Sequence, residues 1–156
     1  MANSAFWEWA VRVYAAPDVA DACLELQDSH DQCVPLLLFG AWAETQGLGL
    51  AGDTAEAAAD MARSWSAQVI APLRAVRRRL RGPVSDMDDA ARQAIRQQVK
   101  ATELAAEKAL MTALEGLIDP EAGGGRPADN LVFLARHWAP VVPRAALERL
   151  RQQISA

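Results

Sequence analysis

A cluster of arginines is the feature of this sequence with the clearest chemical potential. Three of its members lie four and three residues apart, the spacing that places side chains on one face of a helix. A second basic stripe follows a Gly-Pro turn. The cluster comprises Arg74, Arg77, Arg78 and Arg81, and the second stripe comprises Arg92, Arg96 and Lys100. Because a guanidinium binds carboxylates and phosphates through paired hydrogen bonds, these stripes predict a surface that recognises an anion.

The sequence leaves open which anion meets these arginines. Residues 1–62 hold ten acidic residues and one basic residue, whereas residues 63–100 hold nine basic and three acidic residues. The counterpart is therefore another protein, a phosphate ligand, nucleic acid, or acidic residues of this chain such as Asp18, Asp21 and Asp28. In the last case the stripes are an ordinary solvated face. The net charge of −4 and the pI near 5.2 argue against nucleic acid.

A row of carboxylates offers an enzymatic interpretation. Asp18, Asp21, Glu25 and Asp28 recur at three- and four-residue steps along one predicted helix. Helical prenyl-transfer enzymes use aspartates in this way to hold magnesium against a diphosphate, with arginines nearby. Such sites need acid-rich motifs on two facing helices, and this chain has one convincing motif. The alternative function is therefore a small helical enzyme or a carrier for an apolar, diphosphate-bearing ligand.

The other polar residues give weak signals for catalysis or metal binding. Glu103 and Glu107 lie one helical turn apart, but helical carboxylate–metal sites use Glu-x-x-His pairs, which this sequence lacks. We expect Arg63 to pair with Glu103 or Glu107 across an antiparallel hairpin. Cys23 falls on an apolar helix face, where cysteine acts as a small hydrophobic residue. We therefore predict no catalytic residue, no metal site and no cofactor.

One tryptophan is a further candidate for partner binding. The buried stripe of the first predicted helix consists of Phe6, Trp9, Ala10 and Val13. Trp7 lies one step round the helix from that stripe. We therefore predict that the Trp7 side chain is exposed and available to a partner.

Helices must position all of these residues. Alanine makes up 33 of the 156 residues and no strand-like alternation appears, so the predicted class is all-α. We expect a single-domain bundle of six or seven helices, over 4–15, 17–28, 32–46, 53–81, 85–118, 129–138 and 143–154. The third is apolar on every side between Val34 and Ala43, which is typical of a central helix. The fourth and fifth form a long antiparallel hairpin that turns at 82–83.

Proline and glycine residues mark the expected boundaries between regions of the chain. Residues 1–120 are predicted to form the helical domain, 121–127 a glycine-rich flexible linker, and 128–156 a helical extension docked on the domain. No apolar stretch is long enough to span a bilayer, and the N-terminus lacks the basic start of a signal peptide. Two cysteines make no disulfide framework. We therefore expect a cytoplasmic protein.

Several sequence blocks resemble one uncharacterised family. The blocks are Phe-Trp, Leu-Gln-Asp, Leu-Leu-Leu-Phe and Pro-Leu-Arg, in that order, within residues 6–118. This combination resembles a family of short proteobacterial proteins of unknown function. The resemblance implies a cytoplasmic helical protein and assigns no activity to any residue.

These observations favour a non-catalytic role. We expect a protein-binding or regulatory module that uses the basic hairpin, with Trp7 beside it, to recognise an acidic protein partner. The sequence also allows a homodimer. The enzyme or carrier described above remains the alternative.

Overall fold

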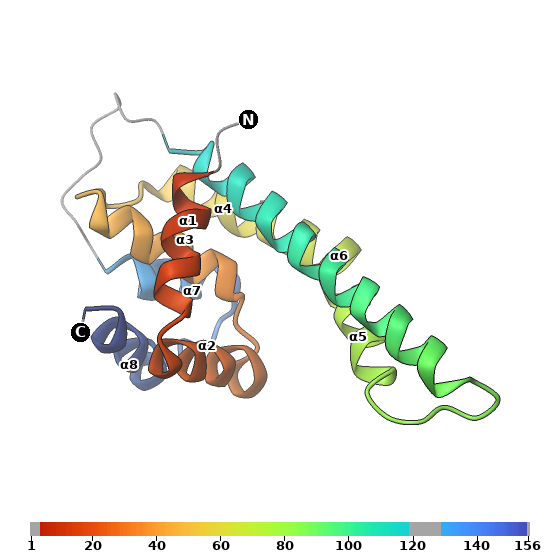
Figure 1. The fold of residues 1–156 in the computed structure, drawn as a ribbon. Helices are drawn as coiled ribbons and strands as arrows, with labels where there is room; N and C mark the ends of the chain where they lie inside the picture. The colour runs from red at the N-terminus through yellow and green to blue at the C-terminus, as the bar shows by residue number, and fades with distance from the viewer. Residues whose placement is uncertain (1–3, 119–128, 156) are drawn as a thin grey trace.

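The computed structural model describes residues 4–118 and 129–155, and the regular elements in these ranges are helices (Figure 1). They are α1 (Ala5–Tyr14), α2 (Pro17–His30), α3 (Val34–Thr45), α4 (Gly52–Trp65), a π-helical turn (Ser66–Ile70), α5 (Ala71–Arg79), α6 (Asp89–Glu115), α7 (Asn130–Trp138) and α8 (Arg144–Ser155). Since α4, the π turn and α5 follow one another without a break, these ranges hold seven helices. The predicted all-α class and helix number are confirmed.

Helix α3 lies at the centre of the hydrophobic core, as its sequence predicts. Each of its residues from Pro35 to Ala43 is buried, because α1, α2, α4, α6 and α7 all pack against it. A helix apolar all round is stable in water only when neighbouring helices cover every face. Even so, no helix in the described ranges is both long and apolar enough to cross a membrane.

One close crossing and one buried side chain join α3 to α7. A Cβ atom on Gly40 would lie 2.6 Å from Cδ1 of Leu134, so a larger residue at position 40 would force the Leu134 side chain to shift. The fully buried Asn130 donates to the carbonyl oxygens of Gly40 and Leu48 at 3.1 and 3.0 Å. Its Oδ1 accepts the Leu50 N–H at 3.1 Å. This amide thus satisfies backbone groups that would otherwise be buried without partners.

An irregular turn separates α4 from α5. Pro72 has no N–H to continue the α-helical hydrogen-bond ladder, and its ring crowds the preceding turn. The π-helical turn Ser66–Ile70 lies directly before this proline. The sequence predicts a kink at this proline. In the structure the missing hydrogen bond is accommodated by one wider, π-helical turn, and the helix continues.

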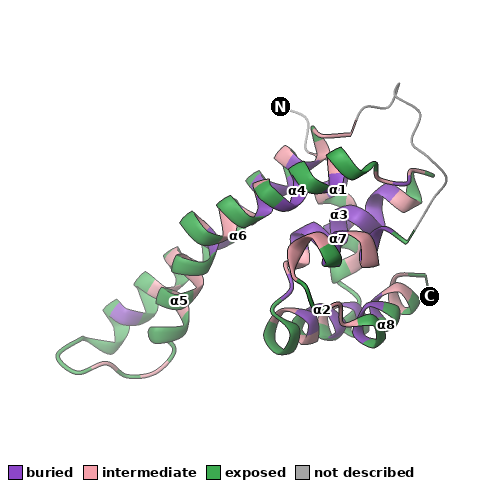
Figure 2. Cartoon of the chain, turned by 180° about the vertical axis from the view of Figure 1, so that it is seen from behind, coloured by how far each residue is buried: buried purple, intermediate pink, exposed green. Residues whose placement is uncertain are grey.

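Helix α5 and the first part of α6 extend away from the rest of the molecule as a two-helix projection (Figures 1 and 2). We call residues 71–103 the arm; it comprises α5, the loop 80–88 and the first part of α6. The remaining described residues are called the body. Asp88 starts α6 by accepting the Ala91 N–H at 2.9 Å on its carboxylate, which satisfies one of the free donors at that helix end. Exposed residues dominate the arm in Figure 2, and α5 buries none of its residues.

The predicted partner of Arg63 is wrong. Arg63 bonds Asp60 at 3.2 Å and the carbonyl oxygens of His137 and Trp138 at 3.2 Å, and its guanidinium lies 5.3 Å from the Trp138 ring centroid. The expectation placed the turn at 82–83. In the structure α5, with Arg74 and Arg77, lies opposite Glu103 instead.

The last two helices share the core of the body. Leu131 and Leu134 of α7 and Leu147 and Leu150 of α8 are all buried. Helix α7 packs mainly on α3, and α8 packs on α2. Arg151 of α8 binds Glu44 at 3.0 Å and also pairs with Asp129. The predicted linker at 121–127 lies outside the described residues.

Candidate functional site

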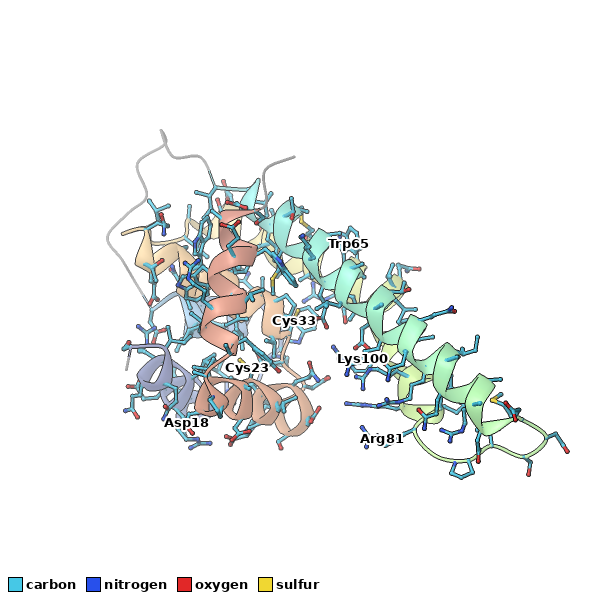
Figure 3. All side chains as sticks on the ribbon, viewed as in Figure 1. Asp18, Cys23, Cys33, Trp65, Arg81 and Lys100 are labelled. Carbon is cyan, nitrogen blue, oxygen red and sulfur yellow. The ribbon has the colours of Figure 1, made fainter. Side chains whose placement is uncertain are left out.

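The arm carries the arginines that the sequence singles out, spread along its length rather than crowded at one end. Figure 3 shows the Arg81 and Lys100 side chains on the side of the arm that faces α2. An ion pair of 3.2 Å between Arg78 and Asp28 joins the arm to α2. Since both side chains of that pair are about half exposed, this contact is weak. The arm is therefore held mainly by contacts at its root.

Two arginines of α5 hold the root of the arm against α6. Nε of Arg77 lies 2.5 Å from Oε2 of Glu103, and Nε of Arg74 lies 3.2 Å from Oε1 of the same carboxylate. Arg74 also approaches Glu107 at 3.6 Å. Glu103 is almost fully buried, so its charge depends on these two guanidinium groups for compensation. We call these four side chains the root network.

The two glutamates of this network differ in proton affinity. Burial alone would raise the pKa of Glu103, but the hydrogen bonds and charges of Arg77 and Arg74 outweigh it, and its pKa is lowered. The pKa of Glu107 is raised, first by burial and then by the charge of Glu103. Glu103 is thus the stably charged partner, and Glu107 holds its charge less readily.

A third arginine has a structural role at the tip of the arm. Arg92 is buried and donates from Nη1 to the carbonyl oxygen of Leu80 at 2.7 Å, which satisfies the C-terminal end of α5. Its Nη2 lies 3.5 Å from Asp89. Arg96 is partly exposed, with Nε buried and without an acceptor among the described residues.

Four cations of the arm remain exposed. They are Arg78, Arg79, Arg81 and Lys100. Arg78 has Asp28 as its partner, whereas no carboxylate in residues 4–118 and 129–155 lies within ion-pair distance of the other three. Arg79 was not among the predicted contacts, because it lies off the stripe formed by the other arginines of α5.

Trp7 is partly buried, where the sequence predicts an exposed side chain. Its ring lies 5.6 Å from Nζ of Lys108, a distance suited to a cation–π contact. Trp7 lines a hollow of about 630 Å³ between α1 and α6, with Val34, Pro35 and Leu38 of α3 in its wall. A more polar hollow of about 520 Å³ continues from it and shares Tyr14, Leu104 and Glu107. Leu104 did not stand out in the sequence, because it belongs to a helix face without a continuous apolar stripe.

The carboxylates of α2 do not gather into a metal-binding group. Glu25 pairs with Arg149 of α8, and Asp28 pairs with Arg78 of the arm. Asp18 and Asp21 are exposed on the same helix. No group of three or more His, Cys, Asp or Glu side chains in the described ranges could hold a metal ion. The acidic row thus serves partly as a surface for arginines from other elements.

Neither cysteine is set up as a nucleophile. Burial raises the pKa of the Cys23 thiol to about 12 and that of the Cys33 thiol to about 11. Both thiols are free, and both stay protonated near neutral pH. His30 lies 3.9 Å from Glu25 at the end of α2. Cys23 therefore acts as the small buried hydrophobic residue that the sequence predicts.

Comparison with known proteins identifies a family and no activity. No curated protein and no solved structure matches the chain. A family model described as "Protein of unknown function (DUF2390)" matches residues 5–114, in agreement with the resemblance seen over 6–118. The match covers α1 to α6 and therefore includes the arm, the root network and both hollows. The chain belongs to this family of proteins of unknown function.

Proposed function

We propose that this protein is a non-catalytic protein-binding or regulatory module whose arm recognises an acidic protein partner. The observation that carries the proposal is the exposure of Arg78, Arg79, Arg81 and Lys100 on a projection whose helix α5 buries no residue. A projection held out from the body offers its side chains to a partner without rearrangement of the core.

The chemistry of the exposed arginines fits carboxylates. Each guanidinium presents a planar set of donors that can bind a carboxylate through two hydrogen bonds. Cations this close to one another raise the local potential, and an acidic partner relieves their repulsion. A protein partner fits better than nucleic acid, because the whole chain carries a net charge of −4.

The arginines of the arm have two roles: some position the arm, and others are available to a partner. Arg74, Arg77 and Arg92 make internal contacts that position the arm. Arg78, Arg79 and Arg81 are the proposed partner contacts, with Arg96 and Trp7 as secondary, partly exposed positions. A second copy of this chain is a candidate partner, because its α2 is acidic.

We place this role in the bacterial cytoplasm. Both cysteines are free thiols, which agrees with a reducing compartment. The family resemblance supports a bacterial origin.

Affinity capture from host lysate tests the proposal. Wild type is compared with Arg78→Glu/Arg79→Glu/Arg81→Glu and with a control of equal charge change, Arg12→Glu/Arg136→Glu/Arg144→Glu, at exposed sites on the body. Circular dichroism first establishes that each variant remains helical.

We expect wild type and the control to retain the same protein, measured by mass spectrometry, and the arm variant to lose it. Because exposed charges are screened by salt, capture should also fall as ionic strength rises. Equal capture by all three forms would refute recognition through the arm.

A further inference from the structure

The two connected hollows at the root of the arm form one groove with an apolar end and a polar end. At the apolar end, Trp7, Ala10 and Val11 of α1 face Leu104 and Met111 of α6. At the polar end lie Tyr14, Arg77, Lys100, Glu103 and Glu107. The apolar hollow, at about 630 Å³, falls within the size range of small-molecule sites, roughly 300–1,000 Å³.

Large apolar side chains around this groove are left in contact with water. Leu104 is 54% exposed, Val11 51% and Tyr14 40%. Val11 and Tyr14 lie on α1 and Leu104 lies opposite them on α6, so the three belong to one surface. Converging exposed apolar side chains mark a binding surface more often than an accident of packing.

At the polar end both carboxylates are already paired with arginines, whereas some of the cationic donors have no partner among the described residues. Glu103 is engaged by Arg77 and Arg74, and Glu107 by Arg74. Lys100 has no carboxylate partner in residues 4–118 and 129–155, and Nη1 of Arg77 makes no hydrogen bond there. The Tyr14 side chain lines the same end. An oxyanion is therefore the complementary group for this end.

The geometry points to a site for an anionic amphiphile: a carboxylate with a single alkyl chain. The chain lies between α1 and α6 against Val11, Leu104 and Met111, and the carboxylate meets Lys100 and Arg77. Lys100 and Met111 are about 16 Å apart along α6, at 1.5 Å per residue, so a chain of medium length spans the groove. This site shares Lys100 and Trp7 with the proposed protein-binding face, but Arg78, Arg79 and Arg81 do not line it.

Isothermal titration calorimetry of the full chain with laurate tests the site, below the concentration at which laurate forms micelles. Octanoate, decanoate and laurate should bind with increasing affinity, by about two- to fourfold per methylene, because each methylene leaves water. Laurate should bind as one molecule per chain. Dodecylamine carries the same chain with a cationic head and should bind at least about tenfold more weakly.

Matched variants locate the ligand. Leu104→Glu should weaken laurate binding by at least about tenfold, because it places a carboxylate in the apolar wall. Leu24→Glu is the control, since Leu24 is similarly exposed at 44% on α2 and does not line the groove. Lys100→Glu, at an exposed position, should weaken laurate about three- to tenfold and leave the affinity for dodecanol unchanged.

Several results would overturn this assignment. They are the absence of laurate binding, equal affinity for laurate and dodecylamine, equal loss in Leu104→Glu and Leu24→Glu, or many laurate molecules bound per chain. Binding of an acidic amphipathic peptide in the groove, without binding of laurate, would also overturn it. None of these results depends on capture by Arg78, Arg79 and Arg81, so this inference and the proposed function fail independently.

Discussion

The body and the arm are both helical, but different interactions stabilise them. In the body, α3 is enclosed by its neighbours, and large side chains such as Phe39, Leu110 and Leu134 are fully buried. In the arm, the buried residues are Leu80, Arg92 and Glu103, two of which are charged. Apolar burial therefore dominates the body, whereas the buried contacts of the arm include arginines that compensate a buried carboxylate and bind a helix end. A segment stabilised in this way can remain exposed and charged.

The largest expected effect comes from the body. Leu134→Ala should lower the free energy of unfolding by about 2–5 kcal/mol, because it removes buried methyl groups where α7 crosses α3. Leu104→Ala, at the exposed root of the arm, should change it by about 0.5 kcal/mol or less. Urea denaturation followed by circular dichroism measures both. An equal decrease in the free energy of unfolding for both variants would show that burial does not distinguish the body from the arm.

The buried Asn130 side chain between α3 and α7 should contribute nearly as much to the free energy of unfolding. Asn130→Ala leaves the carbonyl oxygens of Gly40 and Leu48 and the N–H of Leu50 without their partner. We expect a loss of about 2–4 kcal/mol in the same urea experiment, because buried polar groups without hydrogen bonds are costly. A loss below about 1 kcal/mol would mean that water or other groups replace these hydrogen bonds.

Disrupting the root network should destabilise the arm more than the body. Glu103→Gln leaves Arg74 and Arg77 without their charged partner, and we expect a cost of about 1–3 kcal/mol, reduced because both arginines are partly exposed. Hydrogen exchange should accelerate in α5 more than in α3. Glu56→Gln, at an exposed site on α4, is the matched control and should change neither. Uniform acceleration across all helices would show that the arm does not open separately.

The arm should be only weakly tied to α2. In a double-mutant cycle with Arg78→Ala and Asp28→Ala, we expect a coupling of about 0.5 kcal/mol, because both side chains are half exposed. Added salt should reduce that coupling. A coupling above about 2 kcal/mol would mean that this pair anchors the arm and that Arg78 is not free to bind a partner.

The smallest expected effect is a pH dependence with opposite signs at two neighbouring carboxylates. Because the folded-state pKa of Glu107 is raised, its charge costs stability at neutral pH, and this cost disappears as the pH falls through that pKa. Glu103 has a lowered pKa, so its contribution is present at neutral pH and is lost at more acidic pH.

Glu107→Gln should therefore be slightly more stable than wild type near neutral pH, and the difference should vanish in mild acid. Glu103→Gln should be less stable at neutral pH, with its deficit shrinking at lower pH. Urea midpoints from pH ~8 to pH ~3 measure both. Parallel curves for the two variants would contradict the assigned directions.

The sequence was sufficient for the helices and insufficient for the details of the site. Apolar spacing and turn residues predicted six or seven helices, of which the described ranges hold seven, and the central position of α3, because those signals are local. The pairing of Arg63 with Glu103 or Glu107 was predicted wrongly, because the position of the turn alone does not fix which residues of two packed helices lie opposite one another. The groove beside Trp7 and Tyr14 was not predicted, because it arises where α1 meets α6, far apart in sequence. Arg74 and Arg77 looked like Arg78 in the sequence, and only the fold separates their surroundings.

The central claim is that the arm contacts an acidic protein through its exposed arginines. The most direct measurement is photo-crosslinking in the host cell, with a photoreactive amino acid replacing either Arg79 on the arm or Arg136 on the body, both of which are exposed. The account predicts an adduct with an acidic protein from position 79 and not from position 136, lost when Arg78 and Arg81 are changed to Glu. No adduct from position 79, or the same adducts from both positions, would contradict it.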